Sequence, residues 1–259
     1  MTVKKTFLRF FIVLGIFLGL GIITSKLIGD NEIYRYLGES ILIAPISIIS
    51  LIMFGKKDLL KFEWKSFFKG LLLATPIIAL TIYSMATHIS TWSSLGEGFN
   101  KELILWAFAL FLGAGIGEEL VCRLIGAELF RQTFGNTKKG VFTAILLSSL
   151  FFGLCHLVNI ITFGNDVFST IIQVIYATGF GFFFSAVYFK SRNIWACVVT
   201  HWLFDVSGFS VTSPFGIENE LLANIILAVV FLVSGVVLAL VYLSNYEFDE
   251  EENLKAAIA

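Results

Sequence analysis

Eight long apolar stretches, separated by short polar segments, dominate the pattern of the chain. They cover residues 10–28, 36–55, 70–90, 103–122, 141–162, 168–189, 194–212 and 221–244. A helix of about 20 apolar residues crosses the hydrocarbon core of a bilayer, where the backbone must satisfy its own hydrogen bonds. The pattern therefore predicts an all-α, polytopic membrane helix bundle with about eight transmembrane helices.

The composition agrees with a membrane solvent. Hydrophobic residues make up 57% of the chain and charged residues 14%, whereas soluble domains carry roughly 25% charged residues. The net charge of −1 offers no positive field for nucleic acid, which excludes that partner. The three cysteines fall in apolar stretches without C-x-x-C spacing, so neither a disulfide framework nor a zinc knuckle is expected. No repeat or linker divides the chain, which we treat as a single integral membrane domain, 1–259.

The distribution of lysine and arginine predicts the orientation. With eight helices, the segments on the side of the two termini hold fifteen basic residues and the opposite segments hold three, Lys26, Arg35 and Lys101. Cytoplasmic segments are enriched in basic residues, so both the N- and C-termini are expected in the cytoplasm of a multi-pass cell-membrane protein. The first stretch lacks a clear small-residue cleavage site, and we interpret it as a retained anchor.

A few ionisable residues interrupt these helices. Each costs roughly 2.5–3.5 kcal/mol near the bilayer centre, which makes it a functional hypothesis. The set comes from the fourth, fifth and seventh stretches: Glu118, Glu119, Arg123, His156, His201 and Asp205.

Helical spacing suggests roles for the acidic residues. Glu119 and Arg123 are four residues apart, with the acid first, which favours an ion pair on one helix face. Glu118 lies about 100° around the helix, so it is left for chemistry as a general base. His201 and Asp205 are also four apart and can face one cavity.

Depth is a permissive test of this grouping. Counting 1.5 Å per residue from the nearest inner charges gives depths of about 20, 26 and 14 Å for Glu118, His156 and His201. Helix tilt could bring these levels together, although the numbers alone do not make them coplanar.

Each feature also has a purely structural interpretation. Glu119 with Arg123 can be a structural pair, His156 a hydrogen-bonded bundle residue, and His201 with Asp205 a proton relay or a helix clamp. The glycines at 113, 115 and 117 favour close helix contacts rather than a nucleotide loop, since no strand precedes them. Three separate helices supply the polar set, however, which favours a functional site.

Three ordered motifs carry a family resemblance: Glu118-Glu119-x-x-x-Arg123, Phe152-x-x-x-His156 and His201-x-x-x-Asp205. In this order they resemble the CPBP intramembrane protease family, also called the CAAX-protease and bacteriocin-processing or Abi family, over about residues 100–210. The resemblance implies a membrane-embedded endopeptidase that opens toward the cytoplasm.

The resemblance also implies roles for the site. Glu118 and His156 would activate water, His201 and Asp205 would stabilise the oxyanion or help to hold a metal, and Glu119 and Arg123 would support Glu118. The family has asparagine or aspartate at the last motif position. An ionised Asp205 cannot donate to an oxyanion, so it must be protonated, orient His201 or ligate a metal.

Metal dependence stays open at this point. His156 and His201 with a carboxylate would suffice for a catalytic Zn²⁺ ion with an open water position. The chain has no H-E-x-x-H motif, however, and the resemblance also allows a metal-free glutamate mechanism, which we slightly favour. The absence of a G-x-S-x-G elbow argues against a serine hydrolase of that kind.

The expected partners are membrane lipids and a membrane-associated peptide or protein substrate, either prenylated or a bacteriocin precursor. One alternative is a catalytically silent membrane protein, such as a bacteriocin-immunity factor or a scaffold. Another is a proton-coupled transporter that uses Glu118 and His201 as relays. Transporters often have inverted repeats and paired broken helices, and the sequence shows neither.

Overall fold

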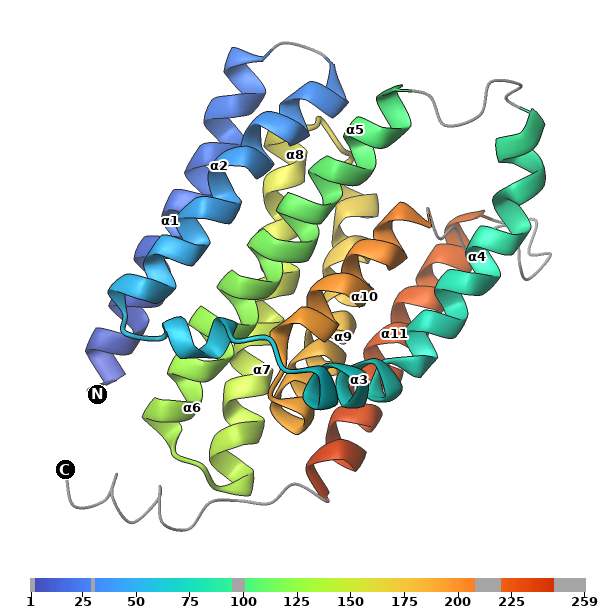
Figure 1. The fold of residues 1–259 in the computed structure, drawn as a ribbon. Helices are drawn as coiled ribbons and strands as arrows, with labels where there is room; N and C mark the ends of the chain where they lie inside the picture. Colours follow the sequence, from blue (N-terminus) through green and yellow to red (C-terminus); the bar gives the residue numbers. More distant parts are fainter. Residues whose placement is uncertain (1–2, 29–30, 95–100, 208–219, 245–259) are drawn as a thin grey trace.

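A computed structural model describes residues 3–28, 31–94, 101–207 and 220–244, and every element in these ranges is helical. Figure 1 shows the elements as a bundle of long helices. Their bounds are α1 (Val3–Leu27), α2 (Glu32–Met53), η1 (Lys57–Leu60), α3 (Trp64–Leu73), α4 (Thr75–Ser94), α5 (Lys101–Leu110), η2 (Phe111–Glu118), η3 (Leu120–Ala127), α6 (Glu128–Phe134), α7 (Lys138–Cys155), η4 (His156–Val158), α8 (Asn159–Thr162), α9 (Val167–Ser191), α10 (Ile194–Val206) and α11 (Glu220–Ser244).

All eight predicted stretches contain helix in their described parts, but not all are long enough to cross a membrane. Six helices pass by length and composition, and a seventh passes if the bent pair α3 and α4, which meet at 69°, is one span. The helix α10 has 13 residues, or about 20 Å, and the last part of the predicted stretch, residues 208–212, lies outside the described residues. The described part of the chain is therefore that of an all-helical membrane protein, with six or seven candidate spans.

The fourth stretch is not the regular α-helix that the spacing argument assumed. The apolar helix runs over Leu103–Phe134, but Phe111–Glu118 and Leu120–Ala127 are π-helical, with hydrogen bonds to the fifth rather than the fourth residue. π-helical turns are rare and occur frequently at functional sites. The prediction of regular α-helical geometry around Glu118 was wrong for this reason.

The glycines of this stretch allow neighbouring helices to approach closely, as predicted. A Cβ atom on Gly113 would lie 2.5 Å from Oγ of Ser40 and 2.7 Å from the hydroxyl of Tyr36, both on α2. A Cβ atom on Gly115 would lie 3.3 Å from the carbonyl oxygen of Val198 on α10. The absence of side chains at these positions brings α2 and α10 against the π-helical segment.

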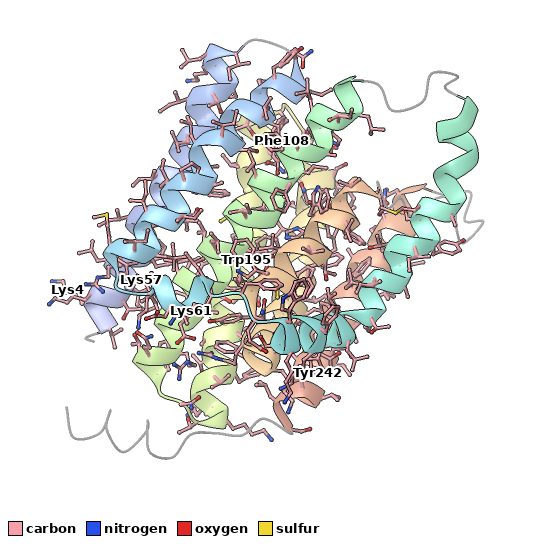
Figure 2. All side chains as sticks on the ribbon, in the orientation of Figure 1. Lys4, Lys57, Lys61, Phe108, Trp195 and Tyr242 are labelled. Carbon is pink, nitrogen blue, oxygen red and sulfur yellow. The ribbon has the colours of Figure 1, made fainter. Side chains whose placement is uncertain are left out.

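Hydrogen bonds fix the start of the short helix α10. The side chain of Asn193 caps the helix by accepting a hydrogen bond from the amide of Trp195 at 3.0 Å, and its Nδ2 donates to the carbonyl of Glu63 at 3.1 Å. The indole of Trp195, labelled in Figure 2, donates to the carbonyl of Leu60 at 2.8 Å. These contacts tie α10 to the η1–α3 segment.

Candidate active site

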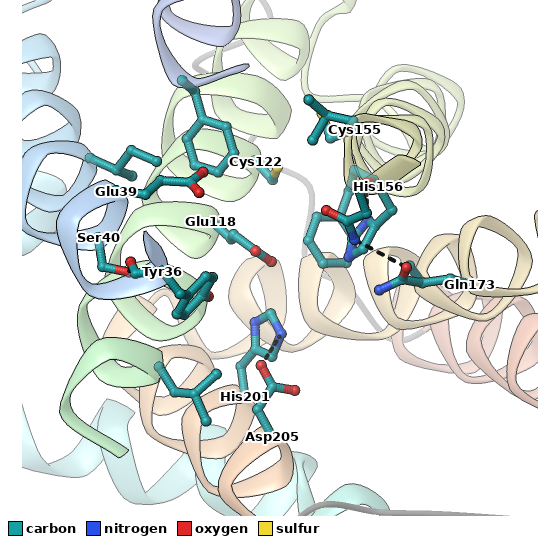
Figure 3. A pocket seen from close by; sticks show the side chains of 18 of the residues that line it. Tyr36, Glu39, Ser40, Glu118, Cys122, Cys155, His156, Gln173, His201 and Asp205 are labelled. Carbon is teal, nitrogen blue, oxygen red and sulfur yellow. Dashed lines mark hydrogen bonds and ion pairs between the residues drawn. The ribbon is translucent and has the colours of Figure 1, made fainter. Parts of the chain in front are cut away.

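A cavity of about 410 Å³ lies inside the bundle, and residues of α2, η2, α7, α9 and α10 contribute to its wall. Four of the six sequence-predicted site residues line it, from three separate helical stretches: Glu118, His156, His201 and Asp205. Figure 3 shows these four side chains pointing toward one space. The other two predicted residues, Glu119 and Arg123, are fully buried behind this wall.

The predicted ion pair between Glu119 and Arg123 is present. Nη2 of Arg123 lies 2.9 Å from Oε1 of Glu119, and both side chains are 0% exposed. The alignment of the N–H groups does not give a regular hydrogen bond, so the contact is an ion pair. The guanidinium also lies over the ring of Phe152, 4.5 Å from its centroid, which contributes a cation–π interaction.

Glu119 has a second partner that the sequence did not indicate. Its Oε1 also lies 2.9 Å from Nδ1 of His201, so one carboxylate oxygen joins Arg123 to helix α10. Because a carboxylate accepts, Nδ1 of His201 carries the proton in this contact. The ring of His201 stacks on Phe184 at 5.3 Å with an interplanar angle of 25°, which further fixes its direction.

Asp205 faces the other nitrogen of the same imidazole. Its Oδ2 lies 3.6 Å from Nε2 of His201, a distance too long for a regular hydrogen bond but within the range of an ion pair. His201 therefore has one carboxylate beside each ring nitrogen, Glu119 and Asp205. This arrangement supports the orienting role among the three that the sequence left open for Asp205.

His156 is held by the backbone of its own helix. Its Nδ1 lies 2.9 Å from the carbonyl oxygen of Phe152, and because a carbonyl can only accept, this nitrogen carries the proton. The neutral ring then presents Nε2 as an acceptor. The ring of Phe152, four residues earlier in the chain, packs edge-on against His156 at 5.1 Å.

Glu118 differs from its neighbour in having no polar partner. Within the described residues, no hydrogen bond or ion pair engages its carboxyl group, and the side chain lines the cavity. The two adjacent glutamates therefore have separate environments, because Glu119 contacts Arg123 and His201, whereas the side chain of Glu118 faces the cavity (Figure 3).

The sequence analysis missed the contribution of α2 to this wall. Tyr36, Glu39 and Ser40 line the cavity opposite the motif residues, and the ring of Tyr36 packs on Trp106 at 5.3 Å. Glu39 is an ionisable residue inside a candidate membrane span, Ile33–Met53. The cost of placing a carboxyl group there was the signal that could have identified it.

The described residues do not fit the proposed zinc site. They contain no group of three or more His, Cys, Asp or Glu side chains arranged to hold a metal ion, whereas a catalytic zinc ion usually needs three protein ligands. Each nitrogen of His201 faces a carboxylate, and Nδ1 of His156 faces a carbonyl. The assignment of His156 and His201 as metal ligands therefore gains no support, and no step below involves a metal.

Part of the chain is similar to a family of known proteins. Residues 100–207 match the family described as type II CAAX prenyl endopeptidase Rce1-like. The chain is similar to this family over 108 of its 259 residues. The matched range contains all six predicted site residues, and it begins after α1, α2, α3 and α4. The Rce1-like family is one of intramembrane proteases, which agrees with the several candidate spans.

One curated relative is CAAX prenyl protease 2 of Saccharomyces cerevisiae. It is 25% identical to this chain over 144 residues, which make up 52% of this chain and 45% of the yeast protein. The chain thus spans about half the length of the curated relative that it matches.

Proposed function

We propose that this Rce1-like protein is an intramembrane endopeptidase in which Glu118 and His156 activate the attacking water. The proposal rests on one contrast: some polar groups of the site are paired with each other, whereas others face the cavity. Glu118 and Nε2 of His156 face one cavity and form no hydrogen bond or ion pair with the described part of the chain, while Glu119 and Arg123 neutralise each other behind it. Free acceptors beside a fixed framework are what a general base requires.

The reaction proceeds in two steps. A water molecule donates hydrogen bonds to the carboxylate of Glu118 and to Nε2 of His156. As the water oxygen bonds to the peptide carbonyl carbon, one water proton passes to Glu118, which leaves a tetrahedral oxyanion. His201, when it carries a proton on Nε2, faces this oxyanion as a donor. The C–N bond then breaks, Glu118 returns the proton to the departing nitrogen, and the remaining hydroxyl stays on the new carboxyl group.

Glu119, Arg123 and Asp205 act through their neighbours in this mechanism. Glu119 holds Nδ1 of His201 at 2.9 Å and is itself held by Arg123. Asp205 lies beside the opposite nitrogen of His201 and favours the protonated imidazole. We therefore regard these three residues as positioning residues for His201, rather than as groups that touch the substrate.

We further propose eight spans with both termini in the cytoplasm. Six helices and the bent pair α3 and α4 supply seven, and α10, tied to the η1–α3 segment by Asn193 and Trp195, is the short eighth. The excess of basic residues on the side of the termini supports this orientation.

The substrate follows from the family only in broad terms. The family and the yeast relative are named for prenylated CAAX substrates. A prenylated protein and a bacteriocin precursor are therefore both substrate classes to be tested, in each case bound from the membrane. The chamber combines the polar site residues with a largely apolar wall, which supports a peptide substrate that reaches it alongside lipid.

The test is cleavage of quenched peptides, prenylated and unprenylated, by the purified protein in detergent. We expect turnover by the wild-type protein and by Asp58→Asn, a surface control whose carboxylate forms an exposed ion pair with Lys61, and none by Glu118→Gln. A metal chelator should leave turnover unchanged. If folded wild-type protein cleaves no peptide, the proposal fails, and a catalytically silent immunity or scaffold role takes its place.

A further inference from the structure

The chamber extends from the site toward one end of the bundle. Beyond His156 its lining continues onto α8 and the following turn, where Asn159, Phe163 and the exposed Asn165 belong to the wall. None of its lining residues belongs to α3 or α6, or to the turns beside them. The fully buried pair of Glu119 and Arg123 also lies outside the lining. We call the region around Asn165 the mouth.

The mouth lies beside the start of α2. Nη1 of Arg35, near the start of α2, donates a hydrogen bond to the carbonyl of Thr162 at 2.9 Å. The guanidinium also lies over the ring of Phe163, 5.5 Å from its centroid. Figure 1 shows α8 at the same end as the start of α2, and the start of α1 at the opposite end.

Most basic residues gather at that opposite end. They belong to the start of α1 and to the connections between α2 and α4, between α6 and α7, and between α9 and α10 (Figures 1 and 2). These thirteen residues are Lys4, Lys5, Arg9, Lys56, Lys57, Lys61, Lys65, Lys69, Arg131, Lys138, Lys139, Lys190 and Arg192. The end that carries the mouth holds three, Lys26, Arg35 and Lys101. Short loops with such an excess stay in the cytoplasm.

From these two observations we infer that the active-site chamber opens on the extracytoplasmic side of the membrane. The inference rests on the proposed peptidase function and gives it a substrate class: an exported peptide, or the outer segment of a membrane-anchored precursor. A prenylated tail on the cytoplasmic face would meet the closed end of the chamber. This orientation is the reverse of the cytoplasmic opening that the family resemblance implies.

The geometry also sets how far the substrate must reach. His156 precedes Asn165 by nine residues of mostly helical chain, which corresponds to roughly 13 Å. An extended peptide covers that depth with about four residues. The cleaved bond therefore lies at least about four residues inside the part of the substrate that enters the mouth, which cleavage-site mapping can measure.

The orientation can be tested without any turnover. In a chain with its native cysteines replaced by serine, Asn165→Cys places a thiol at the mouth, and Lys139→Cys places one at the basic end; both native side chains are exposed. Intact cells are treated with a membrane-impermeant maleimide, before and after permeabilisation. We expect Asn165→Cys to be labelled in intact cells and Lys139→Cys only after permeabilisation. The opposite pattern overturns the inference.

A second measurement separates this inference from the proposed function. Quenched unprenylated peptide is supplied to right-side-out and to inverted membrane vesicles that contain the wild-type protein or Glu118→Gln. We expect wild-type cleavage in right-side-out vesicles alone, and cleavage in inverted vesicles alone overturns the inference. If the labelling pattern is as expected but neither preparation cleaves the peptide, the orientation stands and the peptidase function fails.

Discussion

Replacement of Glu119 by glutamine should destabilise the protein far more than replacement of Glu118, although both variants should lose activity. Oε1 of Glu119 lies 2.9 Å from Nη2 of Arg123 and 2.9 Å from Nδ1 of His201, and the side chains of Glu119 and Arg123 are 0% exposed. Glu119→Gln keeps the size of the side chain but leaves the guanidinium of Arg123 buried without a counter-charge. Loss of one partner of a buried pair costs about 3–5 kcal/mol. Glu118→Gln removes no protein contact and should cost less than about 1 kcal/mol.

The assay is the free energy of unfolding of each variant in mixed detergent and denaturant, beside turnover of a quenched peptide. We expect Glu118→Gln to be stable and inactive, and Glu119→Gln to be both destabilised and impaired. The double variant Glu119→Gln/Arg123→Met removes both charges and should regain much of the stability. If Glu119→Gln is as stable as Glu118→Gln, the assignment of Glu119 as the buried anchor of Arg123 is refuted.

Three further variants probe other parts of the chamber. Gly113→Ala drives a methyl group into α2 and should reduce turnover by about tenfold or more, since small misplacements of site residues are costly. The control Gly15→Ala, where an added Cβ meets nothing within 4 Å, should leave turnover intact. Equal turnover by the two variants would show that the position of α2 does not matter to the site. Glu39→Gln should raise KM for peptides with a basic residue by about two- to fivefold, the scale of a partly exposed ion pair, with little change for neutral peptides; an equal change for both would contradict this. Asp205→Asn should keep measurable turnover, because an amide oxygen can still face His201, whereas Asp205→Leu should abolish it; an inactive Asp205→Asn would mean that the charge itself is required.

Much of the architecture was predictable because lipid imposes a simple rule on the backbone. An apolar stretch of sufficient length must be helical, and each of the eight predicted stretches has helix in its described part. The length of an apolar stretch did not predict where its helix begins or where it bends. The turn at Ala74 bends α3 against α4 by 69°, and α10 begins where Asn193 and Trp195 bind the η1–α3 segment. Those contacts are tertiary, and no local pattern encodes them.

Part of the site was predictable because the pair of Glu119 and Arg123, and the contact of Phe152 with His156, lie within single helices. Spacing along one helix determines such neighbours. The bridge from Glu119 to His201 joins residues 82 positions apart, and the wall formed by α2 depends on packing against Gly113. Such relations between helices require the fold, so the sequence analysis missed them.

The depth estimate shows why the convergence of the site could not be derived by counting. Residue counts measure distance along each helix axis, and they left His156 and His201 about 12 Å apart in depth. In the fold both side chains line one cavity, since α7 and α10 begin at different levels of the bundle (Figure 1). The position of the chamber in the bundle and the direction of the bundle in the membrane have different causes, so the second can be tested separately. The position of the chamber within the bundle comes from tertiary packing, whereas the basic loops determine which end of the bundle lies in the cytoplasm. Moving the excess of basic residues to the loops at the other end should therefore turn the mouth toward the cytoplasm without altering the site.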